Sequence, residues 1–469
     1  MKEYCGVVGI YGHKDAARLA YLALYALQHR GEESAGIVSF DFKKVHAHKG
    51  MGLIGNVFDE NGLKKLKGPM AIGHVRYSTT GSSVIKNVQP LLVDHKKGFI
   101  AVAHNGNLTN SVELRNELEN SGSILQTSMD SELIVHLLAK DQKNNFKEKI
   151  VPIAARMEGA YSFVLMINDA IYAIRDPHGF RPLCIGKLSD GGYIVASETC
   201  ALDMIQAEYV RDVEPGETII IDKDGLTSLK RPDKHRRSHC IFEYIYFARP
   251  DSNVFGNSVY ATRKELGKAL AKEHPVEADL VMPIPDSGTC AALGYAQQSG
   301  IPLEMAFIRN HYIGRTFIQP SQMIRDFKVK VKLNPAKGVL KDKKIIIIED
   351  SIVRGTTSRG RVRALRQAGA KEIHMRVSCP PLISPCFYGI DFPTKKELIA
   401  ANRTVEDIRQ FIGVDTLKYL SLEGMLNSMS QPKEDFCTAC FTGDYPTKIC
   451  KPPSKKALEK RACRGMVIR

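Results

Sequence analysis

The stretch Lys344–Gly360, KIIIIEDSIVRGTTSRG, decides the fold of the second half of this chain. Its four successive isoleucines, Ile345 to Ile348, predict a strand that is buried on both faces, as in a parallel sheet. Two acids follow at once, and a loop with a glycine and several hydroxyls leads into a helical pattern that ends at Gly369. A further apolar run, His374–Cys379, completes a βαβ unit.

The order of these elements predicts a ligand site where the strand ends. In open α/β sheets, ligands bind outside the carboxyl ends of the strands. Glu349 and Asp350 stand there and can accept hydrogen bonds from sugar hydroxyls or hold a hard cation. The loop amides and hydroxyls, at a helix N-terminus, suit a phosphate. The sequence therefore predicts a site for a phosphorylated ribose, although an ordinary strand–turn–helix with an acidic start would show the same pattern.

This stretch resembles the signature of the type I phosphoribosyltransferases, which bind phosphoribosyl pyrophosphate (PRPP). The resemblance implies a domain built around a parallel sheet, with the acid pair on the ribose and the loop on its 5-phosphate. The substrate-binding residues that it implies are Asp350, Ser351, Arg354, Gly355, Thr356 and Thr357.

Length and composition are typical of a soluble globular protein with two or three domains. The chain has 469 residues, of which 43% are hydrophobic and 25% charged. It has no uncharged apolar run of about 18 residues and no apolar signal-peptide region, so we expect a cytoplasmic protein without a membrane partner. The net charge of +15 permits nucleic-acid binding, but Lys and Arg are dispersed and no RNA-binding aromatic motif is present. We therefore expect phosphorylated ligands and no nucleic acid.

The two halves of the chain differ in their predicted elements. To about residue 230, short strand-like runs dominate, with helical patterns at about Ala16–Gln28 and Asn110–Asn120. This pattern favours layered sheets and helices over a doubly wound fold. After the charged segment Lys230–Arg237, strands and helices alternate, which predicts a parallel sheet. We expect Lys395–Leu426 to be helical and Lys451–Arg469 to form a basic surface tail.

Cys5 is a candidate nucleophile, because it stands near the start of the chain before a strand-like run. No Cys/His triad signature surrounds it. If residues 1–4 were removed, Cys5 would carry its own α-amino group, which titrates at about 7.7–8.0 and could act as general base. For a lone cysteine, a small buried hydrophobe at a strand start would be the simpler interpretation.

Cys5 is accompanied by four polar blocks at the ends of predicted strands and helices, where loops gather into sites. The blocks are Gln28–Glu32 (QHRGE), His74–Thr79 (HVRYST), His104–Asn107 (HNGN) and Ser128–Glu132 (SMDSE). Their residue types suit a glutamine pocket. Arg76 can bind an α-carboxylate through two hydrogen bonds, and Asp130 can bind the α-ammonium group. The Asn105 side chain and the Gly106 amide can face the oxyanion of a tetrahedral intermediate.

This set closely resembles the class II glutamine amidotransferases, whose nucleophile is an N-terminal cysteine, over about the first 230 residues. The resemblance implies an N-terminal-nucleophile fold, an αββα sandwich. The catalytic residues that it implies are Cys5, Asn105 and Gly106. The glutamine ligands that it implies are Arg76, Asp130 and, in addition, Arg30.

The four residues before Cys5 are expected to form a propeptide. The cluster-bearing branch of the resembled family makes such a segment and removes it with help from an acid within it, and Glu3 is the only acid available here. We therefore expect the unprocessed chain to lack glutaminase activity, because Cys5 then has no free α-amino group.

In the second half, Pro285–Thr289 (PDSGT) follows a predicted strand and precedes a helical pattern. A glycine flanked by hydroxyls there is a plausible pyrophosphate nest, although a plain βα turn would look the same. By resemblance it is the pyrophosphate loop, and Ser287, Glu349 and Asp350 are the implied ligands of one Mg²⁺ per subunit. This chain departs at Glu349 from the family branch, which usually has two aspartates.

The basic segment His311–Pro335 is long for a plain connection and has few periodic apolar positions. Taken alone, it would be an exposed charged loop. Its Gly-Arg-Thr-Phe-Ile-Gln-Pro block matches a lid that closes over PRPP in the resembled family, and this match implies Arg315 as a substrate-binding residue. Such a lid would exclude water, which competes with ammonia.

Eleven cysteines, an odd number in a chain without a secretion signal, argue against a disulfide framework. Cys437 and Cys440 form a CxxC pair, a spacing that suits zinc, iron–sulfur or redox chemistry, and composition alone leaves zinc open. Cys240 and Cys386 stand in contexts that match the iron–sulfur amidophosphoribosyltransferases. The resemblance implies one structural [4Fe–4S] cluster per subunit, held by these four cysteines.

Over its whole length the sequence resembles the family of glutamine PRPP amidotransferases, in its iron–sulfur, propeptide-bearing branch. The resemblance implies a glutaminase domain over residues 5–234 and a phosphoribosyltransferase domain with the cluster-binding segment over residues 235–469. Glutamine and PRPP would give 5-phosphoribosylamine, pyrophosphate and glutamate, the first step of de novo purine synthesis. The resemblance also implies a homotetramer and feedback inhibition by purine nucleotides.

Two other classes of function are alternatives. One is a different amidotransferase that feeds a sugar phosphate, and the PRPP signature argues against it. The other is a non-catalytic regulator that binds nucleotides or RNA, which the basic charge permits. Such a regulator would not need Cys5, Arg76 and Asn105 together.

Overall fold

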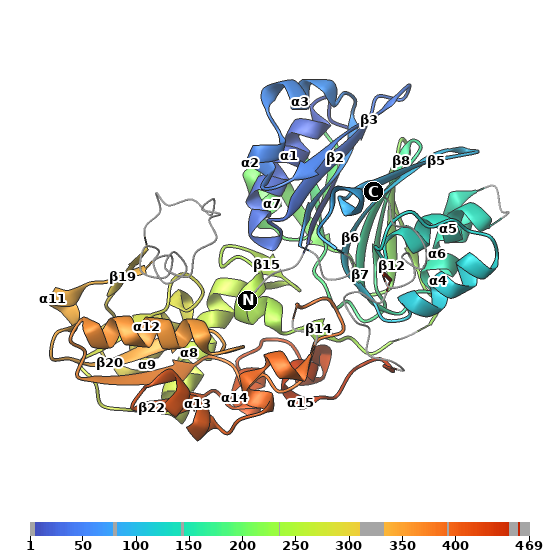
Figure 1. Cartoon of the computed structure of the whole chain (residues 1–469). Helices are drawn as coiled ribbons and strands as arrows, with labels where there is room; N and C mark the ends of the chain where they lie inside the picture. Colours follow the sequence, from blue (N-terminus) through green and yellow to red (C-terminus); the bar gives the residue numbers. More distant parts are fainter. Residues whose placement is uncertain are drawn as a thin grey trace, which may run out of the picture.

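The computed structural model describes residues 5–77, 82–141, 145–233, 235–309, 333–391, 394–449 and 458–459. These residues form an antiparallel sandwich and a half with a parallel sheet, which lie side by side (Figure 1). The expected propeptide, most of the expected lid with Arg315, and most of the basic tail lie outside the described residues.

The first sheet has the start of the chain at its centre. In the described residues it has seven strands, all paired antiparallel, in the order β11-β9-β10-β1-β4-β2-β3. Their bounds are β1 Gly6–Tyr11, β2 Ser34–Phe40, β3 Val45–Met51, β4 Met70–Arg76, β9 Cys184–Lys187, β10 Tyr193–Ala196 and β11 Glu208–Asp212. One face is covered by α1 (Ala16–Ala26), α2 (Ile54–Val57), α3 (Glu60–Lys65) and α7 (Cys200–Met204).

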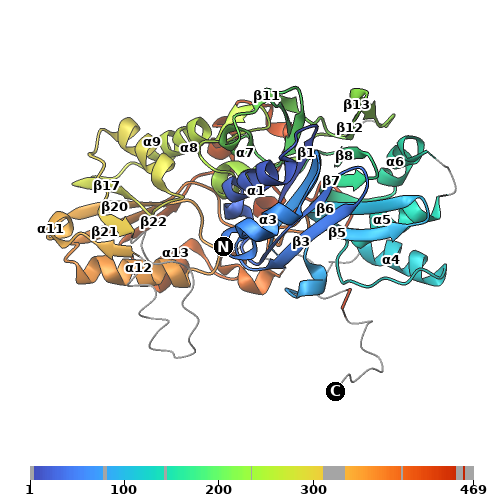
Figure 2. The ribbon, with the colours of Figure 1, turned by 90° about the horizontal axis from the view of Figure 1, so that it is seen from above.

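The second sheet packs on the other face of the first. Within the described part of the chain it has six antiparallel strands in the order β13-β12-β8-β7-β6-β5. Their bounds are β5 Leu91–His95, β6 Gly98–Leu108, β7 Gly159–Ile167, β8 Ala170–Arg175, β12 Glu217–Asp222 and β13 Gly225–Lys230. Its outer face is covered by α4 (Ser111–Asn120), α5 (Glu132–Lys140) and α6 (Phe146–Ala154), as Figure 2 shows from above.

Alternating side chains along the strands build the separate cores of this sandwich. Val7 of β1 lies in the core between the sheets, whereas Val8 and Ile10 lie in the core under α1. Such a split follows from the two-residue period of a strand, whose successive side chains point to opposite faces. The helix–sheet–sheet–helix order confirms the predicted αββα sandwich.

The second half is built on a parallel sheet, as predicted. Among the described residues its four strands have the order β17-β20-β21-β22, and all pairs are parallel. Their bounds are β17 Leu280–Pro283, β20 Lys344–Glu349, β21 Glu372–Val377 and β22 Thr416–Tyr419. The isoleucines of β20 are fully buried, because helices cover both faces of the sheet. These helices are α8 Val259–Glu273, α9 Thr289–Ser299, α12 Thr356–Gln367, α13 Val405–Ile412 and α14 Leu422–Asn427.

Shorter elements complete the second half. Near the junction with the sandwich, β14 (His239–Cys240) pairs in parallel with β23 (Phe436–Cys437), so the start and the end of this half meet (Figure 1). The remaining short elements are β15 Asn253–Val254, β16 Asn257–Ser258, β18 Phe307–Arg309, β19 Leu333–Pro335, α11 Lys337–Leu340 and α15 Ala439–Thr442.

The prediction that Lys395–Leu426 is helical is wrong in part. Helix α13 ends at Gly413, whose φ of +88° closes the helix, and the chain then enters β22 at the edge of the parallel sheet. Leu417 and Tyr419 are buried in this strand. The four residues alternate in burial, but so short a run next to helical patterns is revealed only by its pairing with β21.

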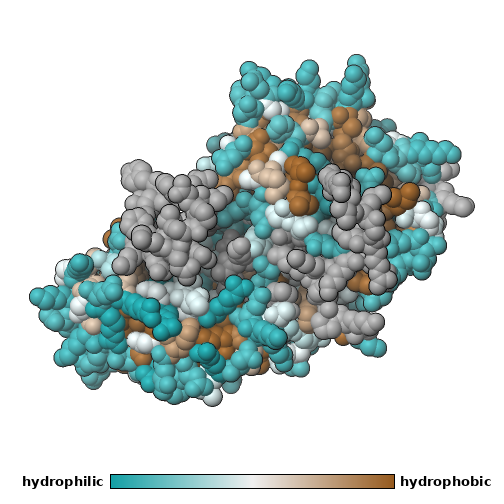
Figure 3. Space-filling view, viewed as in Figure 1, coloured by the Kyte–Doolittle hydropathy of each residue, from teal (hydrophilic) through white to brown (hydrophobic). Residues whose placement is uncertain are grey.

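The surface is mainly polar on the face seen in Figure 3, where hydrophilic side chains dominate and apolar ones form smaller patches. Among the described residues, none of the helices has the length and apolar character that crossing a bilayer requires.

Candidate functional site

Cys5 lies directly before β1 and is buried. Because Gly6 pairs with Val75, the start of β1 lies beside the end of β4 at Arg76. The Cys5 Sγ donates a hydrogen bond to the Tyr77 carbonyl at 3.3 Å. Burial raises the pKa of the Cys5 thiol to about 11, although Tyr77 and Arg76 act in the opposite direction. The thiol is therefore protonated at neutral pH and needs a base to become a nucleophile.

Arg76 and Asp130 supply opposite charges near this thiol, and each interacts electrostatically with Cys5. The buried Asp130 carboxylate accepts a hydrogen bond from the Leu108 amide at 2.9 Å and lies 3.3 Å from His104 Nδ1. Burial acts to raise the pKa of Asp130, but His104 and the backbone amides lower it overall, so the carboxylate is ionised at neutral pH. These are the charges that an α-carboxylate and an α-ammonium group need.

Asn105 and Gly106 lie on β6, where they pair with Ser162 and Tyr161 of β7. Both amide atoms of the buried Asn105 side chain, Nδ2 and Oδ1, have no hydrogen-bond partner among the described residues. A buried polar group without a partner is costly, so an unpaired amide here points to a ligand. Gly106 has a φ of +149°, and a Cβ atom there would lie 2.0 Å from the Ala160 carbonyl oxygen, so the strand requires glycine.

Arg30, which was expected in the glutamine pocket, has its guanidinium group engaged by two buried carboxylates. Its Nε donates to Glu198, and its Nη2 donates to Glu243 at 2.6 Å. Burial acts to lower the pKa of Arg30, but the two carboxylates raise it overall. Glu243 belongs to the π-helical turn Glu243–Phe247 of the second half and also accepts from Arg181 at 3.4 Å. Arg30 therefore joins the two halves, because its charge is already engaged by these acids.

Two further hydrogen bonds join the halves beside the glutaminase residues. Asn107, two positions after Asn105, donates through Nδ2 to the Phe387 carbonyl at 2.9 Å. The Tyr77 hydroxyl donates to Asp391 Oδ2 at 3.1 Å. The site around Cys5 is thus in direct contact with the second half.

The acids at the end of β20 lie where predicted, but in different environments. Both Glu349 oxygens accept from Arg361 Nη1 of α12, at 2.8 and 3.1 Å. Asp350 accepts from the Ser351 hydroxyl at 3.0 Å, and its buried Oδ2 has no partner in the described part of the chain. Burial acts to raise the pKa of both acids, and Arg361 acts to lower that of Glu349. The cation on Glu349 argues against the expected magnesium contact there, whereas Asp350 keeps an oxygen for a ligand.

The loop after Asp350 leads into the N-terminus of α12. Gly355 has a φ of +73° and precedes Thr356, the first residue of this 12-residue helix. Thr356 and Thr357 are exposed, so their hydroxyls and the amides of the first turn can bind a phosphate. Ser287, in the loop after β17, lies close enough to Asp350 to act on the pKa of its carboxyl group, so the expected pyrophosphate loop and the acid pair meet.

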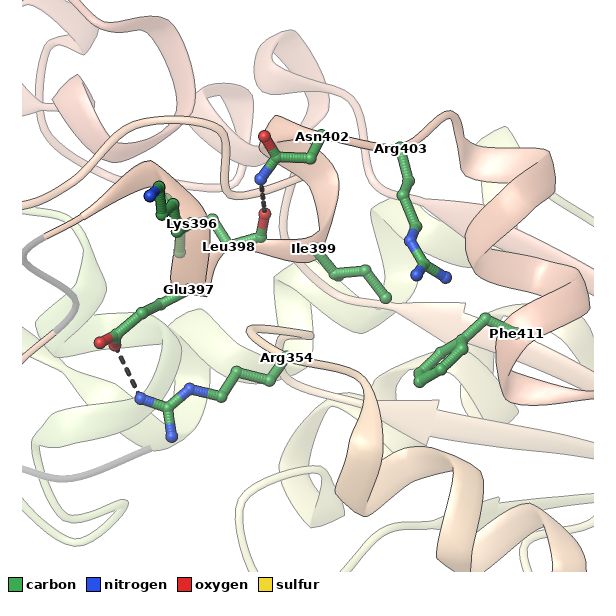
Figure 4. Close-up of a pocket in the computed structure, with 8 residues that line it drawn as sticks. All are labelled: Arg354, Lys396, Glu397, Leu398, Ile399, Asn402, Arg403 and Phe411. Atoms are coloured by element: carbon green, nitrogen blue, oxygen red, sulfur yellow. Dashed lines mark hydrogen bonds and ion pairs between the residues drawn. The ribbon is translucent and has the colours of Figure 1, made fainter.

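Arg354 lines a pocket of about 630 Å³ built on this loop (Figure 4). Its Nη2 donates to Glu397 at 2.7 Å. The Ile399 amide donates to the Val353 carbonyl at 2.8 Å and so fastens the pocket wall to the loop. The lining residues are Arg354, Lys396, Glu397, Leu398, Ile399, Asn402, Arg403 and Phe411. With three cations and one acid, the pocket suits an anionic ligand.

The four expected cluster cysteines gather at the junction of the halves. Cys240 and Cys437 stand opposite each other in the β14–β23 pair, and electrostatic interactions connect both to Cys386 and Cys440. None of the four is in a disulfide, and burial raises the pKa of each thiol. No three Cys, His, Asp or Glu side chains in the described residues are grouped closely enough for a metal ion.

Sequence reasoning missed Glu198, Glu243 and Arg361, which support the site residues and the junction. The partners of the two glutamates are 168 and 213 positions away in the chain, so no local pattern signals them. Arg361 is 12 positions from Glu349, on the helix that follows the acid pair. The one available signal for this ion pair was a basic residue on the helix that follows the acids.

Comparison with known proteins agrees with this geometry. A family model described as a glutamine amidotransferase domain matches residues 74–204. The chain is 52% identical over 448 residues to amidophosphoribosyltransferase 1, chloroplastic, of Arabidopsis thaliana. The aligned region covers 95% of this chain and 79% of that protein. It is 50% identical over 454 residues to the amidophosphoribosyltransferase of Bacillus subtilis, covering 96% and 95% of the two chains.

Among solved structures, the chain is similar to glutamine PRPP amidotransferase from B. subtilis complexed with ADP and GMP. The TM-score is 0.90 at 50% sequence identity, with 95% of this chain and 98% of that chain covered. Both halves and their arrangement are therefore shared. This agreement over nearly the whole length, at half of all positions, shows that the chain belongs to the amidophosphoribosyltransferase family.

Proposed function

We propose that this chain makes 5-phosphoribosylamine from glutamine and PRPP at two connected sites, as the first step of de novo purine synthesis. Ammonia released at Cys5 attacks C1 of PRPP, and glutamate and pyrophosphate are the other products. The observation that carries this proposal is the meeting of Cys5, Arg76 and Asp130, from three distant segments, in one buried site. Membership of the amidophosphoribosyltransferase family supports it.

In the glutaminase step, Cys5 Sγ attacks the side-chain carbonyl carbon of glutamine. The α-amino group of Cys5, freed by removal of residues 1–4, takes the thiol proton and passes it to the leaving nitrogen. The C–N bond breaks, ammonia leaves, and water hydrolyses the glutamyl thioester to glutamate. Arg76 binds the α-carboxylate and Asp130 the α-ammonium group. Asn105 Nδ2 and the Gly106 amide donate to the oxyanion and stabilise its charge.

In the phosphoribosyl site, Asp350 accepts hydrogen bonds from ribose hydroxyls through the oxygen that has no partner in the described chain. Gly355, Thr356 and Thr357 at the N-terminus of α12 bind the 5-phosphate. The remaining proposed PRPP contacts are Ser351, Arg354 and Arg315, the last of which lies outside the described residues. Ammonia moves from Cys5 to C1 where the two halves meet, beside the hydrogen bonds that Asn107 and Tyr77 make with the second half.

Asp350 and Ser287 fit one Mg²⁺ per subunit, because this ion prefers few protein oxygens together with substrate phosphates. When bound, it would neutralise charge that develops on the leaving pyrophosphate. Glu349 is left out of this set, since Arg361 already holds its carboxylate. Removal of the ion with EDTA should abolish product formation and leave glutamine hydrolysis measurable.

Cys240, Cys386, Cys437 and Cys440 fit one structural [4Fe–4S] cluster per subunit. Three buried thiols and the partly buried Cys386 interact with one another, and four thiolates are the ligands that such a cluster takes. The cluster would tie β14 to the C-terminal segment. Four iron atoms and four labile sulfides per chain are expected in anaerobically purified protein. Zinc in their place would contradict this assignment.

We further propose processing of residues 1–4, a cytoplasmic location, a homotetramer and feedback inhibition by purine nucleotides. The B. subtilis structure complexed with ADP and GMP supports the last of these, and the cationic pocket at Arg354 is where we expect such a ligand. Mass spectrometry of the active chain tests the processing, light scattering tests the homotetramer, and inhibition by AMP and GMP tests the feedback. An intact Met1 in active enzyme would contradict the processing.

The main experiment compares pyrophosphate release from PRPP with glutamine or with ammonia as nitrogen source. Cys5→Ala should abolish the glutamine-dependent reaction and keep the ammonia-dependent one, because the second site needs only ammonia. Loss of both reactions in a folded variant, or of neither, would refute the two-site proposal.

A further inference from the structure

Glu349 is held rigidly at the end of β20. Its backbone pairs with Val377 of β21, and its carbonyl accepts a hydrogen bond from the Ser378 amide at 3.0 Å. Its side chain is buried and extends toward α12, where Arg361 Nη1 donates to Oε1 at 2.8 Å and to Oε2 at 3.1 Å. The strand thus fixes where this side chain begins, and Arg361 fixes how its carboxylate is turned.

A single nitrogen between both oxygens leaves much of the accepting capacity of Glu349 unused. A carboxylate has about four lone-pair sites, two on each oxygen. The Arg361 contact takes one site on each oxygen, so each keeps one for another donor. Neighbouring hydroxyls on a ribose are donors of the required kind, and Asp350 offers its Oδ2 beside them.

Arg361 is also the ion-pair partner of the buried Glu349 carboxylate. Within the described residues, Arg361 is the only side chain that hydrogen-bonds to the Glu349 carboxylate. The Arg361 side chain is itself 19% exposed, so it reaches this site from the edge of the helix.

From this geometry we propose that Arg361 is a positioning residue for PRPP. It holds Glu349 as a hydroxyl acceptor beside Asp350, so that the two acids together bind the vicinal hydroxyls of the ribose. This inference rests on the PRPP site proposed above and assigns to Glu349 the sugar instead of the metal. It also accounts for a glutamate at this position, because its longer side chain reaches α12.

The test compares three variants of the full-length protein. Arg361→Met removes the cation and keeps the length of the side chain. Arg361→Lys keeps one cationic nitrogen, which is all that the structure uses. Arg363→Met is the matched control, because Arg363 lies on the same helix and is exposed.

The readouts separate positioning from folding. In the ammonia-supported reaction, Arg361→Met should raise KM for PRPP about tenfold or more with little change in kcat, as expected for charged hydrogen bonds lost from binding. Its affinity for ribose 5-phosphate, measured by calorimetry without divalent cation, should fall by a similar factor. Its affinity for 2-deoxyribose 5-phosphate should fall much less, because that ligand lacks a vicinal hydroxyl. Arg361→Lys should restore most of the affinity, and Arg363→Met should match the unmodified protein.

Equal loss of affinity for both sugar phosphates in Arg361→Met, or no loss for either, would overturn the inference. If Arg361→Met does not fold, Glu349→Gln is measured with the same two sugar phosphates. This variant keeps the shape of the side chain and weakens the acceptor, so the same difference between the two affinities is expected. An unmodified protein that makes no product from PRPP and ammonia would instead refute the proposed function.

Discussion

The sandwich and the parallel sheet each build one site, and the two sites have opposite chemical character. In the site proposed around Cys5, three hydrogen-bond donors are expected to bind the oxyanion and the α-carboxylate, namely the Arg76 guanidinium, the Asn105 amide and the Gly106 backbone. In the site proposed at the end of β20, carboxylate acceptors are expected to bind the sugar, and Asp350 keeps an oxygen without a partner among the described residues. The difference follows from the ligands, because an oxyanion requires donors whereas sugar hydroxyls require acceptors.

The two sites are also held in place by different means. The oxyanion residues lie inside β6, where the register with β7 fixes them. The acid pair lies where a strand ends, and side-chain contacts with Arg361 and Ser351 fix it. A change that crowds the β6–β7 pair, as at Gly106, should therefore disturb backbone, and changes at the acid pair should disturb mainly side chains. Substitutions at the junction and in each site test this contrast.

The largest effect is expected at the junction between the halves. Glu243→Ala leaves Arg30 and Arg181 buried without this carboxylate, and breaking such a buried pair costs about 3–5 kcal/mol. Denaturant unfolding should show this loss. Glu60→Ala is the control, because Glu60 and its partner Arg18 are exposed and such a pair contributes little to stability. Equal stability of the two variants would show that the junction does not depend on this ion pair.

Within the sandwich site, Asn105→Ala should lower kcat for glutamine by about 10²–10³-fold, or about 2.7–4 kcal/mol. The lost amide is a donor to the oxyanion and has no other partner among the described residues, so folding should be unaffected. The ammonia-supported reaction serves as the internal control and should be unchanged. A rise in KM without a fall in kcat would place Asn105 in substrate binding instead.

A smaller effect is expected for Gly106→Ala. The added Cβ would overlap the Ala160 carbonyl oxygen at 2.0 Å, so β7 must move, at a cost of about 1–3 kcal/mol. Thermal unfolding measures the loss, and glutamine-dependent activity should fall with it because the oxyanion residues shift. Unchanged stability and activity would mean that the β6–β7 pair is not rigid and that strand register does not fix the sandwich site.

The smallest effect is expected for Gly355→Ala in the phosphate loop. Its φ of +73° disfavours alanine by about 1 kcal/mol, but the nearest atom to a Cβ is the end of the Ile399 side chain at 3.0 Å, which can turn away. PRPP affinity should weaken only slightly, as shown by KM in the ammonia-supported reaction. An effect larger than that of Gly106→Ala would reverse the proposed order.

Short-range patterns in the sequence were enough for much of the fold and for many site residues. Ile345–Ile348 predicted a buried strand, and the acids after it predicted a site, because strand, loop and helix are contiguous there. The polar blocks near Cys5 predicted residues that the structure does bring together, since each block marks the end of an element. Strand β22 could not be predicted, because its identity depends on pairing with β21 and not on its own pattern.

By itself, the sequence determined two sheet-based halves and predicted the nucleophile at Cys5 and the acid pair, because these depend on residue type and on neighbours along the chain. Only the tertiary structure showed which charged groups Arg30 and Glu349 contact. Arg30 stands in a block that predicts a glutamine ligand, yet Glu243, 213 positions away, engages it. The sequence around Glu349 suggests a metal ligand, whereas the structure shows that Arg361 donates a hydrogen bond to its carboxylate. Charges act through space, so the partner that a folded chain brings near decides what a charged residue does.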